Sequence, residues 1–178
     1  MFVFVIVYKC INITLFKVTK REINMSKNYE NKLLSLGISL PDAPAPAANY
    51  VPYVVVGDMV YISGQISGDA NGRINGKLGE NFSVEQGQLA AKSCGINLIA
   101  QLKAACDGDL DRLVQVVKLG GFVNCTADFT DHPKVINGAS DLMVEIFGEA
   151  GKHARAAVGS SSLPLGVAVE IEGVFQIR

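Results

Sequence analysis

Alternation between hydrophobic and polar positions predicts strands in five segments of the chain. The five cover 51–56, 59–66, 113–123, 154–159 and 167–177, and all of them except 154–159 contain several β-branched residues. Gly57-Asp58 separates the first two, a pair that favours a tight hairpin turn. The last segment alternates most clearly, with Val, Ile and Phe on one face and with Glu170 and Glu172 on the other. A weaker, glycine-interrupted extended segment is expected at 72–78.

Two other segments repeat hydrophobic residues at steps of three and four, which predicts helices with one apolar face. The first follows Ser83, which has Gln86 three residues later in the spacing of a capping box. The second follows Asp131 and Pro133, which favour a first helical turn, and it ends at Gly148. A shorter amphipathic helix is expected within 26–40, before a proline-rich stretch.

The order of these elements predicts one α+β domain, in which a mixed sheet carries two helices on one face. Two helices cover only one side of such a sheet. Several strands are nevertheless hydrophobic on both faces, notably at 54–56 and 114–119. Burying the second face is favourable by roughly 25 cal/mol per Å2 of apolar surface. We therefore expect a homo-oligomer that packs sheet to sheet.

The N-terminal residues differ from the rest of the chain. Residues 1–24 begin with an apolar run that is followed, and not preceded, by Lys and Arg, which is unlike a signal peptide. The run is also too short and too interrupted for a membrane span of about 20 apolar residues. Because Met25-Ser26-Lys27 is typical of an ordinary start, we interpret 1–24 as an upstream or non-native extension. Residues 25–48 are then an N-terminal segment, and 49–178 are the main domain.

Composition narrows the classes of function. Hydrophobic residues make up 49% of the 178, and the formal net charge is −1, so we expect a packed core and no broad surface for nucleic acid. The four cysteines (Cys10, Cys94, Cys106 and Cys125) lack C-x-x-C spacing, and with two histidines they predict neither a metal site nor a disulfide framework. We therefore expect a reduced, cytoplasmic protein without a metal and without a nucleic-acid or membrane partner.

Few residues mark a reaction. The sequence has no G-x-S-x-G elbow or phosphate-binding loop, so a nucleophilic triad around His132 or His153 has little support, and His132 is expected at the surface. Arg155 enters a hydrophobic strand, where it fits either an edge ion pair or a bidentate clamp for a carboxylate ligand. Glu170 lies on a strand that we expect to pair with the strand of Arg155. It is either a solvated residue or, in a cleft, a group that orients water and moves its proton.

Several short motifs together resemble a known family. They are V-Y-I-S-G-Q at 60–65, V-V-K at 116–118, A-R at 154–155, L-P at 163–164 and V-E-I-E at 169–172. In this order, from about Asn49 to Arg178, the chain resembles the YjgF/RidA family of reactive intermediate deaminases, which also carries the label endoribonuclease L-PSP. The resemblance implies a chorismate-mutase-like fold and homotrimers, whose sheets form a central barrel with ligand clefts between subunits.

The same resemblance implies an activity. It is the hydrolytic deamination of short-lived enamines and imines of the 2-aminoacrylate type to 2-keto acids and ammonia, with no cofactor. Arg155 corresponds to the family's substrate-carboxylate arginine, and Glu170 corresponds to the acid that positions water or relays protons. Ser63 and Ser140 are further candidates for binding the small carboxylate substrate.

Other cleft positions remain open. The family's cleft tyrosine corresponds to Tyr50 or Tyr53, and its cleft asparagine to Asn137 or to the position of Ser140. The family's cleft cysteine corresponds to Ala157 here, and the long N-terminal segment resembles a less characterised branch of the family. An alternative function is therefore regulatory: the trimer would bind a small carboxylate without turnover. The family's older label, ribonuclease, is not favoured by a net charge near zero.

Overall fold

The computed structural model describes residues 28–43 and 49–178 of the chain. Residues 1–27 and 44–48 lie outside the described part, and so does the interpretation of 1–24. The elements, with η for a short 3-10 helix, are α2 (Asn28–Ser35), β1 (Tyr53–Val56), β2 (Met59–Ile66), β3 (Gly68–Asp69), β4 (Gly72–Arg73), α3 (Val84–Ala105), η1 (Leu110–Arg112), β5 (Leu113–Asn124), α4 (His132–Phe147), η2 (Gly148–Gly151), β6 (Ala154–Ser160), η3 (Pro164–Gly166) and β7 (Val169–Ile177).

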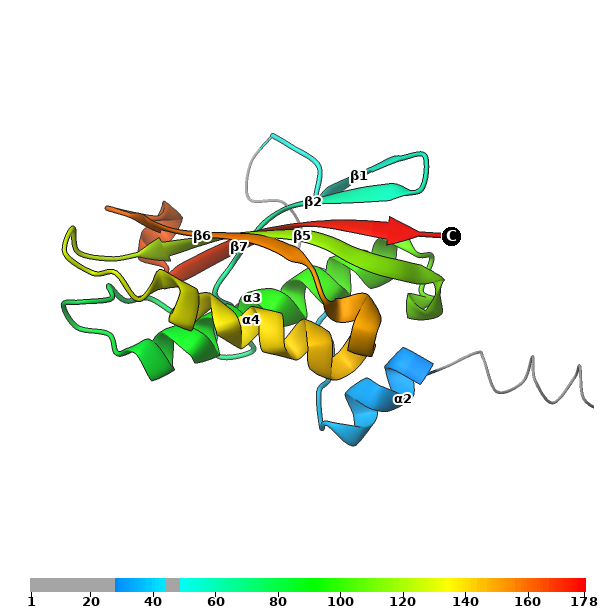
Figure 1. The fold of residues 1–178 in the computed structure, drawn as a ribbon, viewed down its shortest axis with the longest axis horizontal. Helices are drawn as coiled ribbons and strands as arrows, with labels where there is room; N and C mark the ends of the chain where they lie inside the picture. The colour runs from blue at the N-terminus through cyan, green and yellow to red at the C-terminus, as the bar shows by residue number, and fades with distance from the viewer. Residues whose placement is uncertain (1–27, 44–48) are drawn as a thin grey trace, which may run out of the picture.

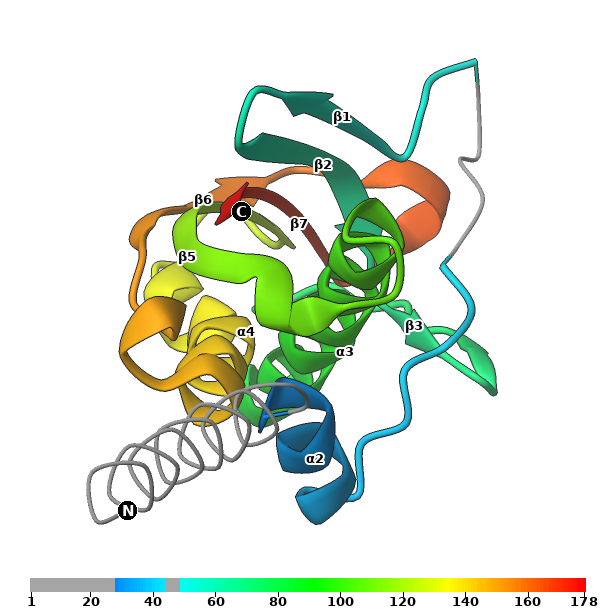
Figure 2. The same ribbon diagram turned by 90° about the vertical axis from the view of Figure 1, so that its right-hand side faces the viewer.

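Five strands form one mixed sheet, and two helices cover one of its faces (Figure 1; Figure 2). The strand order is β1-β2-β7-β5-β6, in which β5 and β6 are parallel and the other neighbours are antiparallel. Helices α3 and α4 pack against each other on the side that we call the helix face, and the opposite side is the open face. This arrangement confirms the predicted α+β fold with two helices on one face.

Local sequence signals place the two helices. The Ser83 side chain accepts a hydrogen bond from the Gln86 N–H (3.2 Å), and the Gln86 side chain accepts one from the Ser83 N–H (2.9 Å), so the predicted capping box is confirmed. The helices approach each other closely at Gly138 of α4, where a Cβ atom would collide with the backbone carbonyl of Gln88. Within 28–43 and 49–178, neither of these helices nor α2 has the length and apolar content to cross a bilayer.

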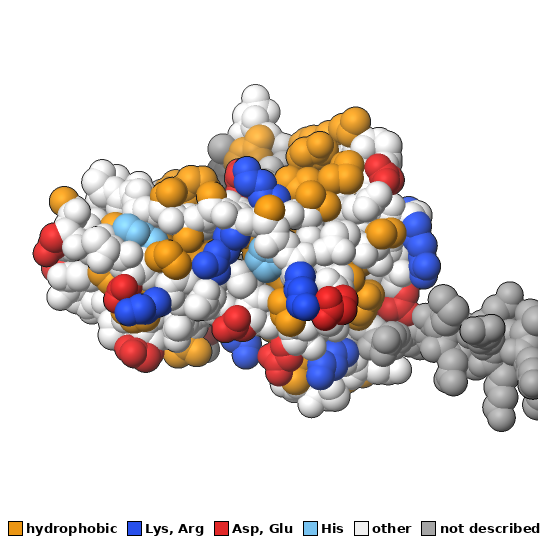
Figure 3. Space-filling view, in the orientation of Figure 1, with side chains coloured by type: hydrophobic (Ala, Val, Ile, Leu, Met, Phe, Trp, Pro, Cys, Tyr) orange, Lys and Arg blue, Asp and Glu red, His pale blue; other side chains and the backbone are white. Residues whose placement is uncertain are grey.

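The two faces of the sheet differ in burial. On β7, Val169, Ile171 and Phe175 are fully buried on the helix face, as the alternating pattern predicted. On the open face, four large hydrophobic side chains are between 44% and 48% exposed: Val54, Tyr61, Val114 and Val158. Figure 3 shows hydrophobic side chains gathered over β1 and β2. Strands β1, β2, β5 and β6 thus carry hydrophobic side chains on the open face as well, and one chain leaves that face uncovered.

Helix α2 packs at one end of the same core. Leu33 is buried, and the Tyr29 ring meets the Phe147 ring of α4 edge-on, with centroids 4.9 Å apart. Glu30 forms an ion pair with Lys103 of α3 (2.7 Å). The segment before the proline-rich stretch therefore shares the hydrophobic core of the sheet and the helices.

One expectation about the strands is wrong. β6 does not pair with β7, because β5 lies between them. Alternation along a strand predicts which side chains share a face, but it does not define the neighbouring strand. The weak extended segment expected at 72–78 is confirmed in part: Gly72–Arg73 pairs with Gly68–Asp69, and Asn75 and Leu78 form isolated β-bridges to Val167 and Cys125.

Candidate active site

Arg155 lies on the edge strand β6, where its side chain is exposed. Its Nη1 group donates to Asn137 Oδ1 (2.9 Å) and to Ser140 Oγ (3.0 Å), and its Nη2 group donates to the Pro133 carbonyl (3.4 Å). None of the ion pairs among the described residues includes Arg155. A guanidinium has five N–H donors, so Nε–H and one N–H of Nη2 have no partner in this part of the chain. A fixed cation with two adjacent donors fits the two oxygens of a carboxylate ligand.

Ser140 and His153 extend this network. Asn137 and Ser140 are three residues apart on α4, so both face the same way. Ser140 Oγ lies 3.0 Å from His153 Nε2, and His153 Nδ1 lies 2.6 Å from the Gly151 carbonyl oxygen. Because a carbonyl only accepts, Nδ1 carries a proton, and in the neutral ring Nε2 accepts from the Ser140 hydroxyl. A chain of hydrogen bonds therefore joins the Gly151 carbonyl, the imidazole, the hydroxyl and the guanidinium.

This network has the parts of an acid-base site. A hydroxyl contacts an imidazole base, and a third group orients the base. Asn137 and Ser140, which competed for one position in the sequence, both contact the guanidinium. His153 received no role from the sequence, although its place two residues before Arg155, at the start of a strand, was the signal available.

Glu170 lies on the other face of the sheet. Arg155 is paired with Leu119 of β5, whose side chain is buried in the core, whereas Glu170 is paired with Phe122 of the same strand. Position 122 is three positions after 119 on the strand, and side chains an odd number of positions apart point to opposite faces. One protomer therefore does not bring Arg155 and Glu170 together, and a site that uses both needs two protomers.

Glu170 has the environment of a proton-transfer group. It is partly buried and lies over Gly64, at the irregularity of β2 between Ile62 and Gln65. A Cβ atom at position 64 would collide with the Glu170 carboxyl group. Burial, and then the charge of Glu172, raise the pKa of Glu170 above its ordinary value. Such a carboxyl group keeps its proton closer to neutral pH, which suits it to donate and accept protons.

The other predicted binding residues lie at the opposite edge of the sheet. Tyr50 is exposed in the segment before β1, whereas Tyr53 is partly buried and packs against the core. The Ser63 hydroxyl on β2 donates to the Val51 carbonyl (2.8 Å), which ties that segment to the sheet. Since β1 and β6 are the two edges, Tyr50 and Ser63 are separated from Arg155 by the width of the sheet in one protomer.

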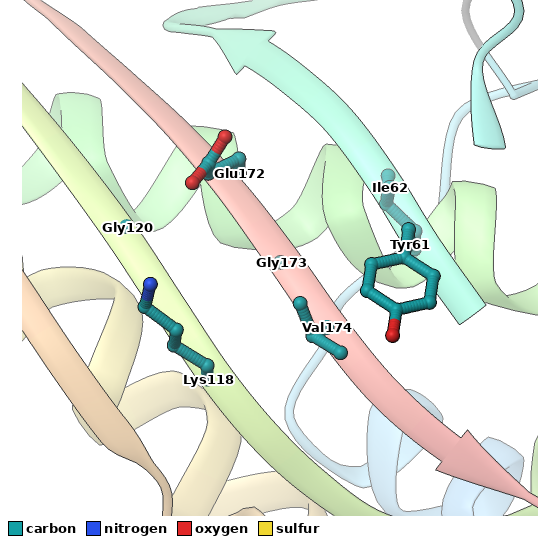
Figure 4. A pocket seen from close by; sticks show the side chains of 7 residues that line it. All are labelled: Tyr61, Ile62, Lys118, Gly120, Glu172, Gly173 and Val174. Carbon is teal, nitrogen blue, oxygen red and sulfur yellow. The ribbon is translucent and has the colours of Figure 1, made fainter. Parts of the chain in front are cut away.

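The open face carries a shallow hollow of about 130 Å3 (Figure 4). Tyr61 of β2, Glu172 of β7 and Lys118 of β5 line it, from three neighbouring strands. Lys118 and Glu172 carry opposite charges, but they are not among the ion pairs of the described residues. The hollow therefore contains one carboxyl group, of Glu172, and one amino group, of Lys118, and it lies on the face opposite to the Arg155 network.

His132 corrects one expectation. It is partly buried, and not at the surface as expected, because its Nε2 lies 3.4 Å from Cys125 Sγ and its ring meets Phe129 edge-on.

Ala157, at the family's cysteine position, lies on the helix face two residues after Arg155 and is paired with Gly121. The described part of the chain therefore has a thiol near β6, but it is not at the family's position.

Comparisons with known proteins identify the family of the chain. A family described as "YjgF/chorismate mutase-like, putative endoribonuclease" matches residues 30–172. The chain is 48% identical over 148 residues to Protein TCP17 of Trypanosoma cruzi, which covers 82% of this chain and 92% of that protein. It is 32% identical over 141 residues to a 2-iminobutanoate/2-iminopropanoate deaminase of Dermatophagoides farinae, covering 79% and 95% of the two chains.

Solved structures show the same similarity. A protein of unknown function from Agrobacterium tumefaciens has a TM-score of 0.81 and 42% identity, with 87% of this chain and 96% of that chain covered. E. coli TdcF, solved with bound serine, has a TM-score of 0.56 and 25% identity, with 77% and 94% covered. From its fold, its motifs and these matches, the chain belongs to the YjgF/RidA family.

Proposed function

We propose that this protein hydrolyses small enamines and imines that carry a carboxylate, of the 2-aminoacrylate type, to 2-keto acids and ammonia. The observation that carries the proposal is Arg155, an exposed guanidinium braced by Asn137 and Ser140, with donors left for a ligand. Two relatives support it. One is named as a deaminase of imino acids, and another was solved with serine, a small molecule with a carboxylate.

Arg155 would bind the substrate and fix its reactive carbon. In a 2-imino acid the electrophilic carbon is bonded directly to the carboxylate carbon, so a bidentate grip on the carboxylate also places the site of attack. A protonated imine is already electrophilic, which is why no cofactor is required. The remaining task is to supply a water molecule and to move its proton.

The hydroxyl and imidazole beside Arg155 suit that task. His153 Nε2, acting through the Ser140 hydroxyl, takes a proton from water as the new C–O bond forms. The nitrogen of the resulting carbinolamine is then protonated, the C–N bond breaks and ammonia leaves. Loss of the hydroxyl proton gives the 2-keto acid. The Gly151 carbonyl keeps the imidazole in the tautomer that accepts at Nε2.

Glu170 would act as a second proton-transfer group in a cytoplasmic homotrimer. In a closed ring of identical subunits, the β6 edge of one copy meets the β1–β2 edge of the next. The open faces then point inward and bury their exposed hydrophobic side chains, which is the favourable term. In that arrangement Glu170, Tyr50 and Ser63 from one copy approach Arg155 of another.

One observation favours an alternative. Ala157 stands where the family has a cleft cysteine, so the same cleft could hold a small carboxylate as a regulatory ligand without turnover. The two functions share the arginine clamp and differ only in the proton transfers.

A coupled assay separates the two functions. A pyridoxal-phosphate-dependent serine dehydratase generates 2-aminoacrylate, and release of the 2-keto acid is followed with and without this protein. We expect acceleration by the wild type and a loss of about 10²-fold or more in Arg155→Ala. Arg73→Ala, at an exposed arginine of β4, is the matched control and should act like the wild type. Absence of acceleration, with pyruvate still bound, would support the regulatory alternative.

A further inference from the structure

A second hydrogen-bonded imidazole lies farther along β6, outside the Arg155 network. Cys125 follows the end of β5, and its N–H donates to the Ser160 carbonyl of β6 (3.0 Å), which fixes its backbone. Its Sγ atom lies 3.4 Å from Nε2 of His132, the first residue of α4. Both side chains line a hollow of about 290 Å3. A thiol and a base therefore meet at the wall of an open space.

Gly159 makes this pairing possible. A Cβ atom at position 159 would lie 2.7 Å from Cys125 Sγ and would collide with His132 Nε2. The Phe129 ring meets the imidazole edge-on, with centroids 5.4 Å apart, and holds its orientation. The thiol and the imidazole therefore lie side by side, and both line the hollow together with Gly159 and Phe129.

The other two described thiols have different surroundings. All three described thiols are buried, but Cys94 and Cys106 are 0% exposed whereas Cys125 is 5% exposed and lines the hollow. Burial raises the pKa of the Cys94 and Cys106 thiols above the ordinary value. Cys94 Sγ donates to the Val169 carbonyl (3.5 Å), which cannot take a proton. Among the described cysteines, Cys125 alone has a side-chain base within hydrogen-bonding distance. Thiolates, and not thiols, are the nucleophiles in such sites.

The lining of the hollow indicates the kind of ligand. It contains hydroxyl-bearing and apolar side chains but no Lys, Arg, Asp or Glu. It also contains no second cysteine, so it lacks the resolving thiol of a disulfide-exchange site. We propose that Cys125 and His132 form a nucleophilic thiol site that captures small, uncharged α,β-unsaturated carbonyl compounds.

The reaction balances without an oxidant or another reactant. His132 Nε2 takes the thiol proton, and the sulfur lone pair attacks the β-carbon of the ligand to form a C–S bond. The π electrons of the C=C bond move toward the carbonyl as an enolate. The imidazolium then returns the proton to the α-carbon, so that the product is a thioether on Cys125 and the imidazole is neutral again.

Acrylamide is the probe, with the full-length protein and with glutathione as an internal standard. The rate of modification at each cysteine is read by peptide mass, so Cys10 is counted separately. We expect Cys125 of the folded protein to react at least about tenfold faster than Cys125 of the urea-unfolded chain, since an assisting base contributes roughly 10²–10⁴-fold. Cys94 and Cys106 should react more slowly when the protein is folded.

A variant tests the role of the imidazole. His132→Gln should lower the Cys125 rate at least about tenfold, whereas Asp141→Asn, at an exposed position of the same helix, should leave it unchanged. The proposal is overturned if Cys125 is protected on folding as Cys94 and Cys106 are. It is also overturned if folded His132→Gln reacts at the wild-type rate. If that variant does not fold, the comparison of folded and unfolded wild type decides alone.

Discussion

The two faces of the sheet differ in how much of a site a single chain completes. On the helix face, Gly121 of β5 lets Ile136 of α4 pack against the sheet, and α4 supplies the groups that hold Arg155. On the open face, the adjacent Gly120 is met only by the flexible Glu172 side chain, and Val158 stays 47% exposed. The groups that hold Arg155 are therefore placed by the packing of one chain, whereas Glu170 lies on the open face, which we propose that a second copy covers.

The largest expected effect comes from breaking the open face. Val158→Asp places a charge at the hydrophobic edge of that face, and burying an unpaired charge strongly opposes association. We expect the oligomer to dissociate and turnover of 2-aminoacrylate to fall by about 10²-fold or more, because the Arg155 cleft loses its second wall. Light scattering and the coupled assay measure the two effects.

Val144→Asp is the matched control for that change. Val144 is 39% exposed on α4, away from the open face, so its variant should keep both the assembly and the activity. An oligomeric and fully active Val158→Asp protein would contradict the proposed role of the open face.

The next effect concerns the proton path on the helix face. His153→Gln keeps a hydrogen-bonding side chain next to Ser140 but removes the base. We expect kcat to fall by about 10²-fold while KM changes little, because general-base assistance acts on the chemical step and not on carboxylate binding. Steady-state kinetics give both constants. A raised KM with unchanged kcat would mean that His153 only braces the arginine.

A pair of neighbouring glycines tests the assignment of faces. A Cβ atom at Gly121 would lie 2.6 Å from Ile136 Cδ1 in the core, so Gly121→Ala should lower the free energy of unfolding by about 1–3 kcal/mol. A Cβ atom at Gly120 would lie 2.8 Å from Oε1 and 2.9 Å from Cγ of Glu172, whose exposed side chain can turn away, so Gly120→Ala should change the free energy of unfolding by less than about 0.5 kcal/mol. Urea unfolding, with both variants and the wild type at the same protein concentration, measures these two changes in the free energy of unfolding. Equal effects would contradict the assigned faces.

The smallest effect is a pH dependence at Glu170. Because the pKa of Glu170 is raised in the folded protein, mainly by burial, the folded chain binds this proton more tightly than the unfolded chain does. The free energy of unfolding therefore decreases as pH rises through the interval between the unfolded and the folded pKa. Glu170→Gln, which cannot ionise, should lose less stability over this interval than the wild type.

The control for this pH series is Glu145→Gln, at an exposed position of α4. It should follow the wild-type pH dependence. Unfolding curves between acidic and neutral pH measure all three proteins, and identical slopes for Glu170→Gln and the wild type would show that Glu170 does not bind its proton more tightly on folding.

Much of the fold could be predicted because its signals are local. The capping box at Ser83, the hairpin at Gly57-Asp58 and the alternation of β7 each involve residues close in sequence. The order of the strands could not be predicted. β5 is hydrophobic on both faces and fits the centre of a sheet as well as β7 does, so the sequence does not say which of them lies beside β6.

The site was predictable only in part for the same reason. Motifs indicated Arg155 and left Asn137 and Ser140 as alternatives, but the contact of His153 with Ser140 depends on how the end of α4 turns back into β6. The contact of His132 with Cys125 depends on a glycine in a third segment. Contacts of this kind arise from packing between elements, which periodicity does not encode.

Calorimetric titration with pyruvate tests the carboxylate clamp most directly, because it requires no turnover. We expect pyruvate to bind the wild type and to bind Arg155→Ala at least about tenfold more weakly, since hydrogen bonds to a charged group contribute about 1.5–3 kcal/mol. Pyruvamide, which lacks the negative charge, should bind the wild type as weakly as pyruvate binds the variant. Equal affinity of wild type and Arg155→Ala for pyruvate would contradict the account.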